Sequence, residues 1–540
     1  MANSTTSSSL LGGLGTLFYC VPPSQLLSSS APSSSADEAL LFRGLKPYVT
    51  EAIPFFVLLV AAEAAAGLLL HGRRLYRLND LVHSFSLGIV QQMLGLWTKA
   101  AGVAVYVYLW RHHRLLPPGL LFPHDDWRGW LTLLLGCDVA YYWFHRTAHS
   151  IHALWAAHAV HHSGEDYNLA TALRQGALQS SSSWVFYLPL ALLGAHPALY
   201  AAHQSLNTLY QFWIHTSLVG HLGPLEYVLN TASHHRMHHR PPGNCNYAGV
   251  LIVWDRMFGT FRPEDRQREC YGLAKQAESF DPLHTNAEHW RRVHANIANG
   301  AGARRQQQQQ KQQQGGGGGG GGMIDAAARF VAATLRRRVR HPMVFRPAAL
   351  FEPLKQEGLW NLPPSAEEAA AAAAAATAAA APSAEAAAAA AAVVDRACPP
   401  GERRKYDGRH GALGALRGAY VLAHFVGVLG FALFGVLLPF GSLGRADAAA
   451  RCLGVALSLS CVGRLADGGG LGEAMETARV GLVAAGLLLW RPAAVAAVVA
   501  PGALAAALVL AWGGVLAAGG GEEAVGVGGK EKEKEEKKKA

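Results

Sequence analysis

Long runs of apolar residues recur along this chain, and they predict membrane-spanning helices. Residues 52–70 supply about the 20 apolar positions that a helix needs to cross a bilayer core. A second run covers residues 85–110, where two glutamines and a lysine interrupt the pattern, and it predicts one long kinked helix or two short ones. A third run, residues 130–144, leads directly into a group of histidines.

Charged residues near the first run predict how its helix is placed. Glu63 lies in the middle of the run, and because an ionisable group is costly in lipid, we expect it to face other helices. Arg73, Arg74 and Arg77 follow the run. Since basic residues are enriched on the cytosolic side of membrane proteins, they predict that this end of the helix lies in the cytosol.

The later part of the chain alternates between apolar and low-complexity segments. Residues 184–200 are apolar but contain Pro189 and Pro197, which predict a bent helix or a re-entrant hairpin. Residues 304–322 are rich in Gln and Gly, and residues 365–392 in Ala and Glu, compositions that build no packed core. Three or four C-terminal helices are expected from apolar runs at about residues 419–440, 448–463, 479–490 and 493–518.

These patterns divide the chain into five parts and predict its fold class. We expect a disordered Ser-rich extension, a membrane catalytic domain, a low-complexity linker with a basic amphipathic segment, a set of C-terminal transmembrane helices and a charged tail, covering residues 1–45, 46–300, 301–411, 412–520 and 521–540. The expected fold is all-α, a polytopic integral membrane protein.

Composition supports a membrane setting and argues against a nucleic-acid partner. Hydrophobic residues make up 51% of the chain and charged residues 16%, against about 25% charged in a typical soluble domain. Much of the net charge of +10 comes from arginine clusters beside apolar runs, where they would face anionic lipid headgroups. The seven cysteines show no CxxC pairing, so we expect reduced thiols and neither a structural disulfide nor structural zinc.

Histidines gather in one stretch and in a regular pattern. Of the 25 histidines, 14 fall within residues 145–239. The motifs HRTAH, HAVHH and HRMHH hold eight of them: His145, His149, His158, His161, His162, His235, His238 and His239. Positions i, i+3 and i+4 share one helix face, so each group directs its imidazoles the same way. Neutral imidazole is a common ligand of iron, zinc and copper, and eight donors suit two ions. The pattern therefore predicts a dinuclear metal site.

Two further residues near these groups have a functional and an ordinary interpretation. Asp138 precedes His145 by one heptad, where it could accept a hydrogen bond from the second ring nitrogen of a ligand. It could equally be a polar residue that is satisfied between helices. His215, in QFWIHT, is either a further ligand or a histidine that hydrogen-bonds within the core.

Taken together, the motifs resemble a known family. HRTAH, HAVHHSGEDYNLATALRQ, QFWIHT, LGPLEYVLNTASHHRMHH and NYAGVLIVWDRMFGTF are similar, in this order, to the fatty acid hydroxylase and sterol desaturase superfamily. The histidine groups mark the superfamily alone, whereas EDYNLATALRQ and NYAGVLIVWDRMFGTF resemble its ether-lipid-cleaving branch. The resemblance covers about residues 50–285 and continues more weakly over residues 412–515, where LADGGGLGEAMETAR is similar to a late Asp…Glu…Arg pattern.

The resemblance implies a multi-pass endoplasmic-reticulum membrane enzyme with a histidine-rich diiron cap facing the cytosol. Two Fe ions, O2 and tetrahydrobiopterin would serve to hydroxylate the carbon next to the ether oxygen of a lipid substrate, which then releases a fatty aldehyde. The eight grouped histidines would ligate the irons, with His215 as a ninth ligand. Glu165, Tyr167 and Asn168 match family positions beside the second group and would assist substrate or pterin binding, Glu165 as the pterin-binding carboxylate.

Two other functions stay open at the level of the sequence. A sterol or fatty acyl hydroxylase or desaturase with another electron donor would share the same histidine groups. A metal transporter or sensor could use them to bind zinc reversibly, but transporters place polar ligands within their spans, whereas these histidines lie at or outside the apolar runs. Zinc fits the ligands but has no redox chemistry, and the sequence has no HExxH motif of a zinc protease.

Overall fold

The protein is helical throughout the part that the structure describes. The computed structural model describes residues 13–26, 41–42, 44–123, 126–241, 243–264, 270–273, 276–295, 415–437, 439–468 and 472–481. Within these ranges no β-strand occurs, and single residues form isolated bridges, as between Leu229 and Leu251. The expected all-α fold class is therefore confirmed. Residues up to Gly469 form one compact unit, and those from Gly470 onward form a second, in which residues 472–481 are helical.

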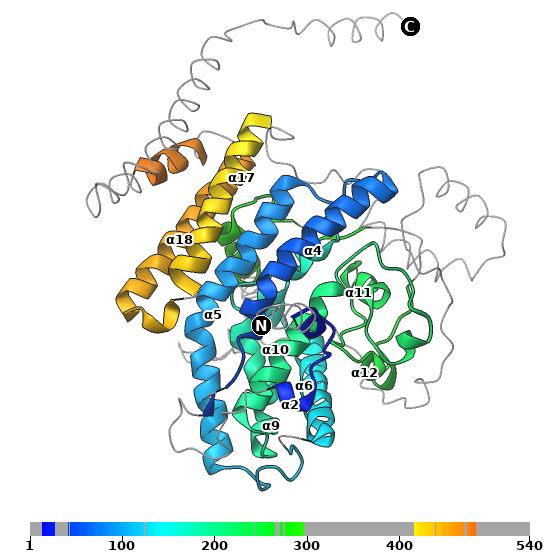
Figure 1. Cartoon of the computed structure of the whole chain (residues 1–540). Helices are drawn as coiled ribbons and strands as arrows, with labels where there is room; N and C mark the ends of the chain where they lie inside the picture. The colour runs from blue at the N-terminus through cyan, green and yellow to red at the C-terminus, as the bar shows by residue number, and fades with distance from the viewer. Residues whose placement is uncertain are drawn as a thin grey trace, which may run out of the picture. The chain divides into compact units, whose positions relative to one another are not determined.

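The first unit contains the elements that carry the histidines (Figure 1). In chain order its labelled helices are α2 (Pro23–Leu26), α4 (Tyr48–His71), α5 (Leu78–His112), α6 (Trp127–Ala148), α7 (His152–His158), η1 (His161–Ser163), η2 (Leu169–Leu173), α8 (Gln179–Ser183), η3 (Trp184–Tyr187), α9 (Leu188–Leu192), α10 (Pro197–Trp213), η4 (Gly223–Tyr227), α11 (Ala232–His239), α12 (Val253–Met257), α17 (Ala415–Gly430), η6 (Phe431–Leu437), η7 (Phe440–Ser442) and α18 (Arg445–Asp467).

Three of the described helices are long and apolar enough to cross a membrane. They are α4, the continuous helix at Arg417–Leu437 that joins α17 to η6, and α18. Only 17% of the most apolar part of α4 is buried inside the protein, which leaves most of its surface for lipid. The expected helices over residues 85–110 and 130–144 are present as α5 and α6. Both are long enough to cross a membrane, but neither is among the three helices that are also apolar enough.

The polar residue in the middle of α4 faces the protein, as its sequence position predicts. Glu63 is buried and accepts hydrogen bonds from the Thr216 hydroxyl, the Tyr76 hydroxyl and the backbone N–H of Leu169 (2.8 Å). Three donors satisfy a carboxylate that would otherwise be costly within an apolar helix. The same contacts fix α4 against the segments that precede and follow the histidine groups.

Helix α5 connects two hydrophobic cores. Its C-terminal half buries Tyr106 and Trp110 in a core shared with α6, α9 and α10. Its N-terminal half buries Val82 and Ile89 in a second core shared with α17, η6 and α18. Figure 1 shows α17 and α18 side by side along α5. Residues far apart in the sequence thus close around one long helix.

The apolar run at residues 184–200 is broken, as its prolines predict. Pro189 and Pro197 lie in the first turns of α9 and α10, where a missing backbone N–H costs no hydrogen bond. Gly194, with φ of +88°, forms the turn between the two helices. After the break a new helix, α10, begins at Pro197, and it ends at Trp213, two residues before His215.

Part of the N-terminal extension is structured, so the prediction of disorder is wrong there. Leu17 and Leu26 are buried in the first core, and the Tyr19 hydroxyl lies 2.8 Å from Nδ1 of His203. The short apolar patch within the Ser-rich stretch supplies enough side chains to pack against the helices. His203 is accordingly a core histidine with a hydrogen-bonding role.

One cysteine also departs from the sequence expectation. Cys270 is disulfide-bonded, whereas Cys20, Cys137, Cys245, Cys452 and Cys461 are free. The expectation of reduced thiols throughout is therefore wrong at Cys270, because pairing between distant cysteines leaves no spacing motif. The Gln-, Gly- and Ala-rich segments and the apolar run at residues 493–518 lie outside the described residues.

Helix α18 is tied to the segment that follows the histidine groups. Asp467 accepts hydrogen bonds from the Ser279 hydroxyl and from the Phe280 backbone N–H, both at 2.6 Å. Arg464 donates through Nε to Asp281 at 2.8 Å. At Gly463 the two backbones come so close that an added Cβ would lie 2.2 Å from the Phe280 carbonyl oxygen. The C-terminal helices are therefore an integral part of the first unit.

We expect Asp467→Ala to lower the free energy of unfolding by about 2–4 kcal/mol, because it leaves two buried donors without their acceptor. Asp447→Ala is the matched control on the same helix. It removes only an exposed pair with Arg451 and should cost at most about 0.5 kcal/mol. Denaturant unfolding in detergent micelles measures both, and equal losses would contradict the anchoring role of Asp467.

Candidate metal centre

Nine histidines from four segments of the chain converge in the interior. His145, His149, His158, His162 and His238 form a first cluster, and His161, His215, His235 and His239 form a second. Within each cluster, one nitrogen of every imidazole lies within 4.8 Å of the others. All nine side chains are buried. The structure thus brings together the nine histidines that the sequence singled out, His215 among them.

Neighbouring histidines belong to different clusters. His161 belongs to the second cluster and His162 to the first. In the same way, His239 belongs to the second cluster and His238 to the first. Successive residues of a helix point about 100° apart, so a HisHis pair reaches two centres instead of one. Each HxxHH motif therefore contributes to both clusters, which explains why the motif occurs twice.

Backbone carbonyls fix the protonation of several rings. His145 donates through Nδ1 to the Tyr247 carbonyl at 2.8 Å, and His238 donates to the Cys245 carbonyl at 2.8 Å. His161 donates in the same way to the Arg174 carbonyl at 3.0 Å, and His215 to the Gln211 carbonyl at 2.6 Å. Because a carbonyl oxygen only accepts, Nδ1 carries the proton and Nε2 carries a lone pair.

These lone pairs point at one another. Nε2 of His145 lies 3.0 Å from Nε2 of His158, whose Nδ1 is bonded to the Gln179 side-chain oxygen. In the second cluster, Nε2 of His215 lies 3.3 Å from Nε2 of His161. Two lone pairs cannot hydrogen-bond, so their approach needs a cation between them. Two imidazoles on one ion with bonds of about 2.1 Å have nitrogens about 3.0–3.4 Å apart, so the donor set fits a metal ion in each cluster.

Burial keeps the clusters in the form that binds metal. Burial lowers the pKa of His161 to about 4, and the nearby Arg174 guanidinium adds to the effect. Burial and neighbouring imidazoles lower the pKa of His162 and His239 well below the ordinary value. At neutral pH the rings are therefore uncharged donors. Both clusters consist of histidine alone, which suits iron, copper or zinc and disfavours magnesium or calcium.

The carboxylate of Asp138 holds a loop of the backbone. Its carboxylate accepts hydrogen bonds from Asn207, from the backbone N–H groups of Val250 and Leu251 at 2.8 Å, and from Trp254 Nε1 at 2.9 Å. No histidine is among these donors. Of the two interpretations of Asp138, the structure supports the polar residue that is satisfied within the protein. The Tyr247 carbonyl accepts the Nδ1 proton of His145, while Asp138 holds the loop that presents this carbonyl.

Two residues beside the second motif have identifiable contacts. Asn168 caps η2 by accepting from the Ala170 N–H at 3.1 Å, and its amide donates to the Leu75 carbonyl at 2.8 Å. The ring of Tyr167 stacks on Tyr271 with centroids 4.8 Å apart, and its hydroxyl donates to the Ile214 carbonyl, next to His215. These contacts support the second cluster, and direct roles of Asn168 and Tyr167 in catalysis stay predictions.

Glu165 lies outside the clusters. It forms an ion pair with Arg77 at 3.4 Å, and Arg77 also binds Asp166 at 2.7 Å. It lines a recess of about 20 Å³ together with Arg174 and Gln276. That volume holds a single water molecule, so in this conformation the recess does not fit a pterin.

Arg174 is a supporting residue that motif spacing did not reveal. Its guanidinium is buried and donates to Asp80, Ser84 and Ser163, at 3.1, 3.1 and 2.8 Å. Its carbonyl accepts the Nδ1 proton of His161. The signal in the sequence was a lone arginine inside an apolar stretch, which needs a buried carboxylate partner. That partner, Asp80, lies 94 residues earlier.

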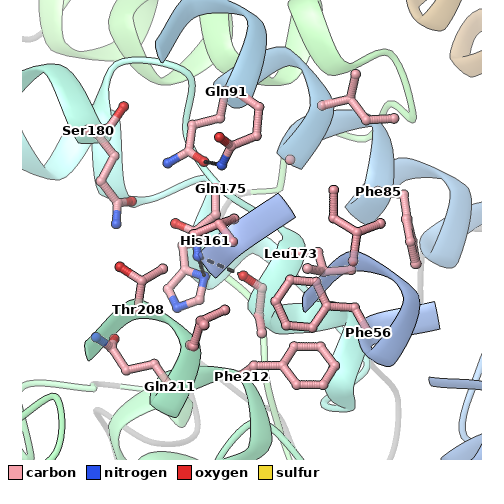
Figure 2. A pocket seen from close by; sticks show the side chains of 18 of the residues that line it. Phe56, Phe85, Gln91, His161, Leu173, Gln175, Ser180, Thr208, Gln211 and Phe212 are labelled. Carbon is pink, nitrogen blue, oxygen red and sulfur yellow. Dashed lines mark hydrogen bonds between the residues drawn. The ribbon is translucent and has the colours of Figure 1, made fainter. Parts of the chain in front are cut away.

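A cavity of about 290 Å³ borders the second cluster. His161 and His215 both line it, together with side chains from α4, α5, α10, η6 and the segments between them. Figure 2 shows its lining as two parts: His161 with Gln91, Gln175, Ser180, Thr208 and Gln211 on one side, and Phe56, Phe85, Leu173 and Phe212 on the other. Among the described lining residues none is Asp, Glu, Lys or Arg. The cavity therefore suits an uncharged polar group joined to an apolar chain, with His161 beside the polar group.

Part of the chain is similar to known proteins. Residues 130–260 match a family model described as fatty acid hydroxylase. The chain is similar to alkylglycerol monooxygenase of Homo sapiens, with 41% identity over 280 residues, 51% of this chain and 59% of that protein. It is 47% identical over 238 residues to alkylglycerol monooxygenase of Danio rerio, 43% of this chain and 52% of that protein.

More distant similarity reaches an ornithine lipid hydroxylase of Rhizobium tropici, with 30% identity over 149 residues, 26% of this chain and 45% of that protein. The chain spans about half the length of these curated relatives. No solved structure matches the chain.

We expect the double variants His158→Ala/His238→Ala and His145→Ala/His162→Ala each to lower bound metal from about two ions per chain to about one, because each leaves three donors in the first cluster while the second cluster keeps its four. His203→Gln is the control, since His203 is equally buried but lies outside both clusters. Metal analysis of the purified proteins by mass spectrometry gives the result. Two variants that retain a full metal complement would rule out the first cluster as a binding site.

Proposed function

We propose that the chain, whose residues 130–260 match a family model described as fatty acid hydroxylase, is a membrane monooxygenase that hydroxylates the ether-linked carbon of alkylglycerol lipids. The proposal rests on the named relatives for its substrate class. It assigns two iron ions to the histidine clusters, O2 as the oxidant and tetrahydrobiopterin as the electron donor. It places the enzyme in the endoplasmic-reticulum membrane with the clusters on the cytosolic side.

The observation that carries this proposal is that His161 lines the cavity among its polar side chains, with the apolar side chains on the other side (Figure 2). An alkylglycerol that fills the cavity has its hydroxyl groups among the glutamines and its alkyl chain among the phenylalanines. The first carbon of the chain, next to the ether oxygen, then lies beside His161. Desaturation in the middle of an acyl chain would instead require the polar end to lie many carbon atoms away from the histidines.

The protein's own groups bind and orient the substrate. Apolar walls from Phe56, Phe85 and Phe212 stabilise the alkyl chain by about 0.8 kcal/mol for each buried methylene group. The side chains of Gln91, Gln175 and Thr208 offer neutral donors and acceptors to hydroxyl groups. Holding one C–H bond at a fixed place is the main contribution of such walls to the rate.

Bound iron would supply the oxygen activation, because no amino-acid side chain attacks an unactivated C–H bond. In the overall reaction one atom of O2 enters the C–H bond next to the ether oxygen. The other leaves as water, with two electrons and two protons from the pterin. The product is a hemiacetal, whose C–O bond breaks to give a fatty aldehyde and glycerol. The histidines hold the irons, and their buried, uncharged state keeps all donor nitrogens available.

The position of the cavity fits a substrate dissolved in lipid. Val57 lines the cavity from α4 and is 48% exposed on the surface of that helix. Because α4 is a candidate membrane span, a substrate dissolved in lipid would enter the cavity beside Val57. Histidines with fixed tautomers in two closed clusters also argue against a metal transport path, in which ligands must exchange.

We expect the purified protein in lipid vesicles to release a fatty aldehyde from 1-O-hexadecylglycerol, at a rate that depends on O2 and on added tetrahydrobiopterin. The control substrate is the ester 1-hexadecanoylglycerol, in which a carbonyl replaces the methylene group that reacts. It should give no pterin-dependent aldehyde. Gas chromatography of the products makes the measurement. A sterol or fatty acyl product without any aldehyde would support the rival activity instead.

A second prediction concerns Glu165 as the pterin-binding carboxylate. Because charged hydrogen bonds contribute about 1.5–3 kcal/mol, Glu165→Gln should raise the apparent pterin requirement roughly ten- to a hundredfold while metal content stays unchanged. Binding there requires the side chains around the small recess to move aside, Gln276 among them, which donates to the Ser163 carbonyl at 3.1 Å. Asp166→Asn is the control, since it removes the closer partner of the same arginine, Arg77. Equal effects of both variants would mean that Glu165 acts only by holding Arg77.

A further inference from the structure

The C-terminal helices contribute side chains to the cavity although they lie far outside the fatty acid hydroxylase domain. Leu429, Leu433 and Leu437 line it, and they come from the end of α17 and from η6. The matched domain, residues 130–260, ends well before them. Beyond packing, these helices therefore form part of the cavity wall.

These leucines belong to the apolar part of the cavity. Their helix packs on α5 through the second core, where Phe425 meets Phe85 edge to face with centroids 6.2 Å apart. Phe85 is itself a wall of the cavity and lies in its apolar part, away from His161 (Figure 2). Ile89, which also lines the cavity, packs in the same core. The leucines therefore face the region that the alkyl chain occupies.

The geometry of η6 separates its side chains into three directions. Residues Phe431–Leu437 form a π-helical stretch, a conformation that often occurs at functional sites. Ala432 and Val436 are buried in the second core, while Phe434 is 74% exposed. Leu433 lies between these directions and lines the cavity. A change of size at Leu433 thus acts on the cavity, and a change at Phe434 acts on the outer surface.

We propose that Leu429, Leu433 and Leu437 form the wall that limits the length of the alkyl chain, which makes the C-terminal helices the specificity element of the enzyme. This inference rests on the proposed function, since it takes an alkyl chain as the occupant of the apolar part. A chain that reaches the wall is bound along its whole length, whereas additional methylene groups have no place. Each methylene group that is excluded from the apolar part should lower kcat/KM about fourfold.

The test compares chain-length profiles of variants at Leu433. Alkylglycerols from decyl to eicosyl serve as substrates. Leu433→Trp should lower kcat/KM for the octadecyl substrate relative to the decyl substrate by about tenfold or more. Leu433→Ala should shift the preference in the opposite direction, toward longer chains. Val426→Trp is the matched control, because Val426 lies on the same helix, is 56% exposed and does not line the cavity. Its profile should equal that of the wild type.

A binding measurement separates this inference from the proposed activity. Displacement of a dansyl-labelled octadecyl glycerol ether by unlabelled alkylglycerols reports chain-length preference without turnover. If the wild type binds with a length preference that both Leu433 variants shift but releases no aldehyde, the wall is supported and the proposed activity is wrong. If aldehyde is released and neither variant changes the profile in turnover or in displacement, the wall is wrong. The opposite directions expected for Trp and Ala also distinguish a wall from simple misfolding.

Discussion

The repulsion between converging lone pairs is the constraint on which the centre of this protein depends. Nine uncharged imidazoles are buried together, and carbonyl groups hold the ring protons of His145, His161, His215 and His238 on the side away from the neighbouring rings. The remaining nitrogens approach to 3.0–3.3 Å as pairs of acceptors. Such an arrangement is stable only around cations. The affinity for metal therefore depends on the positions of the backbone carbonyls as well as on the histidines.

The loop after α11 supplies two of these carbonyls, and buried carboxylates hold it. Asp255 accepts from the backbone N–H groups of Tyr247 and Ala248 at 2.8 Å, and burial raises its pKa to about 6. Asp138 accepts from the next part of the same loop. The two acids act through the backbone, which turns the Tyr247 and Cys245 carbonyls toward the histidines. The two clusters also differ in role, because only the second contributes lining residues to the described cavity.

The helices and the metal ligands could be predicted because they depend on local spacing in the sequence. Contacts between residues far apart in the sequence could not be predicted. The HxxHH motifs put imidazoles on one face, and the apolar run at residues 52–70 had the length of a span, so both could be found in the sequence. The two interpretations of Asp138 could not be separated in the sequence, since its backbone donors, Val250 and Leu251, lie more than a hundred residues later. Leu433 attracted no attention because a leucine in an apolar run carries no pattern. Its place in the cavity follows from the packing of α17 on α5.

Under the proposed function, substrate entry beside Val57, which is exposed on the candidate membrane span α4, has a kinetic consequence. A cavity that is reached from the bilayer samples substrate in two dimensions, so occupancy follows the mole fraction of substrate in the membrane instead of its concentration in the aqueous volume. Dilution of the membrane with inert lipid then slows turnover at constant total substrate, whereas dilution of the vesicles with buffer does not. A protein and a substrate in the same bilayer stay together when the vesicles are diluted. The rate of turnover would then depend on the lipid composition of that bilayer.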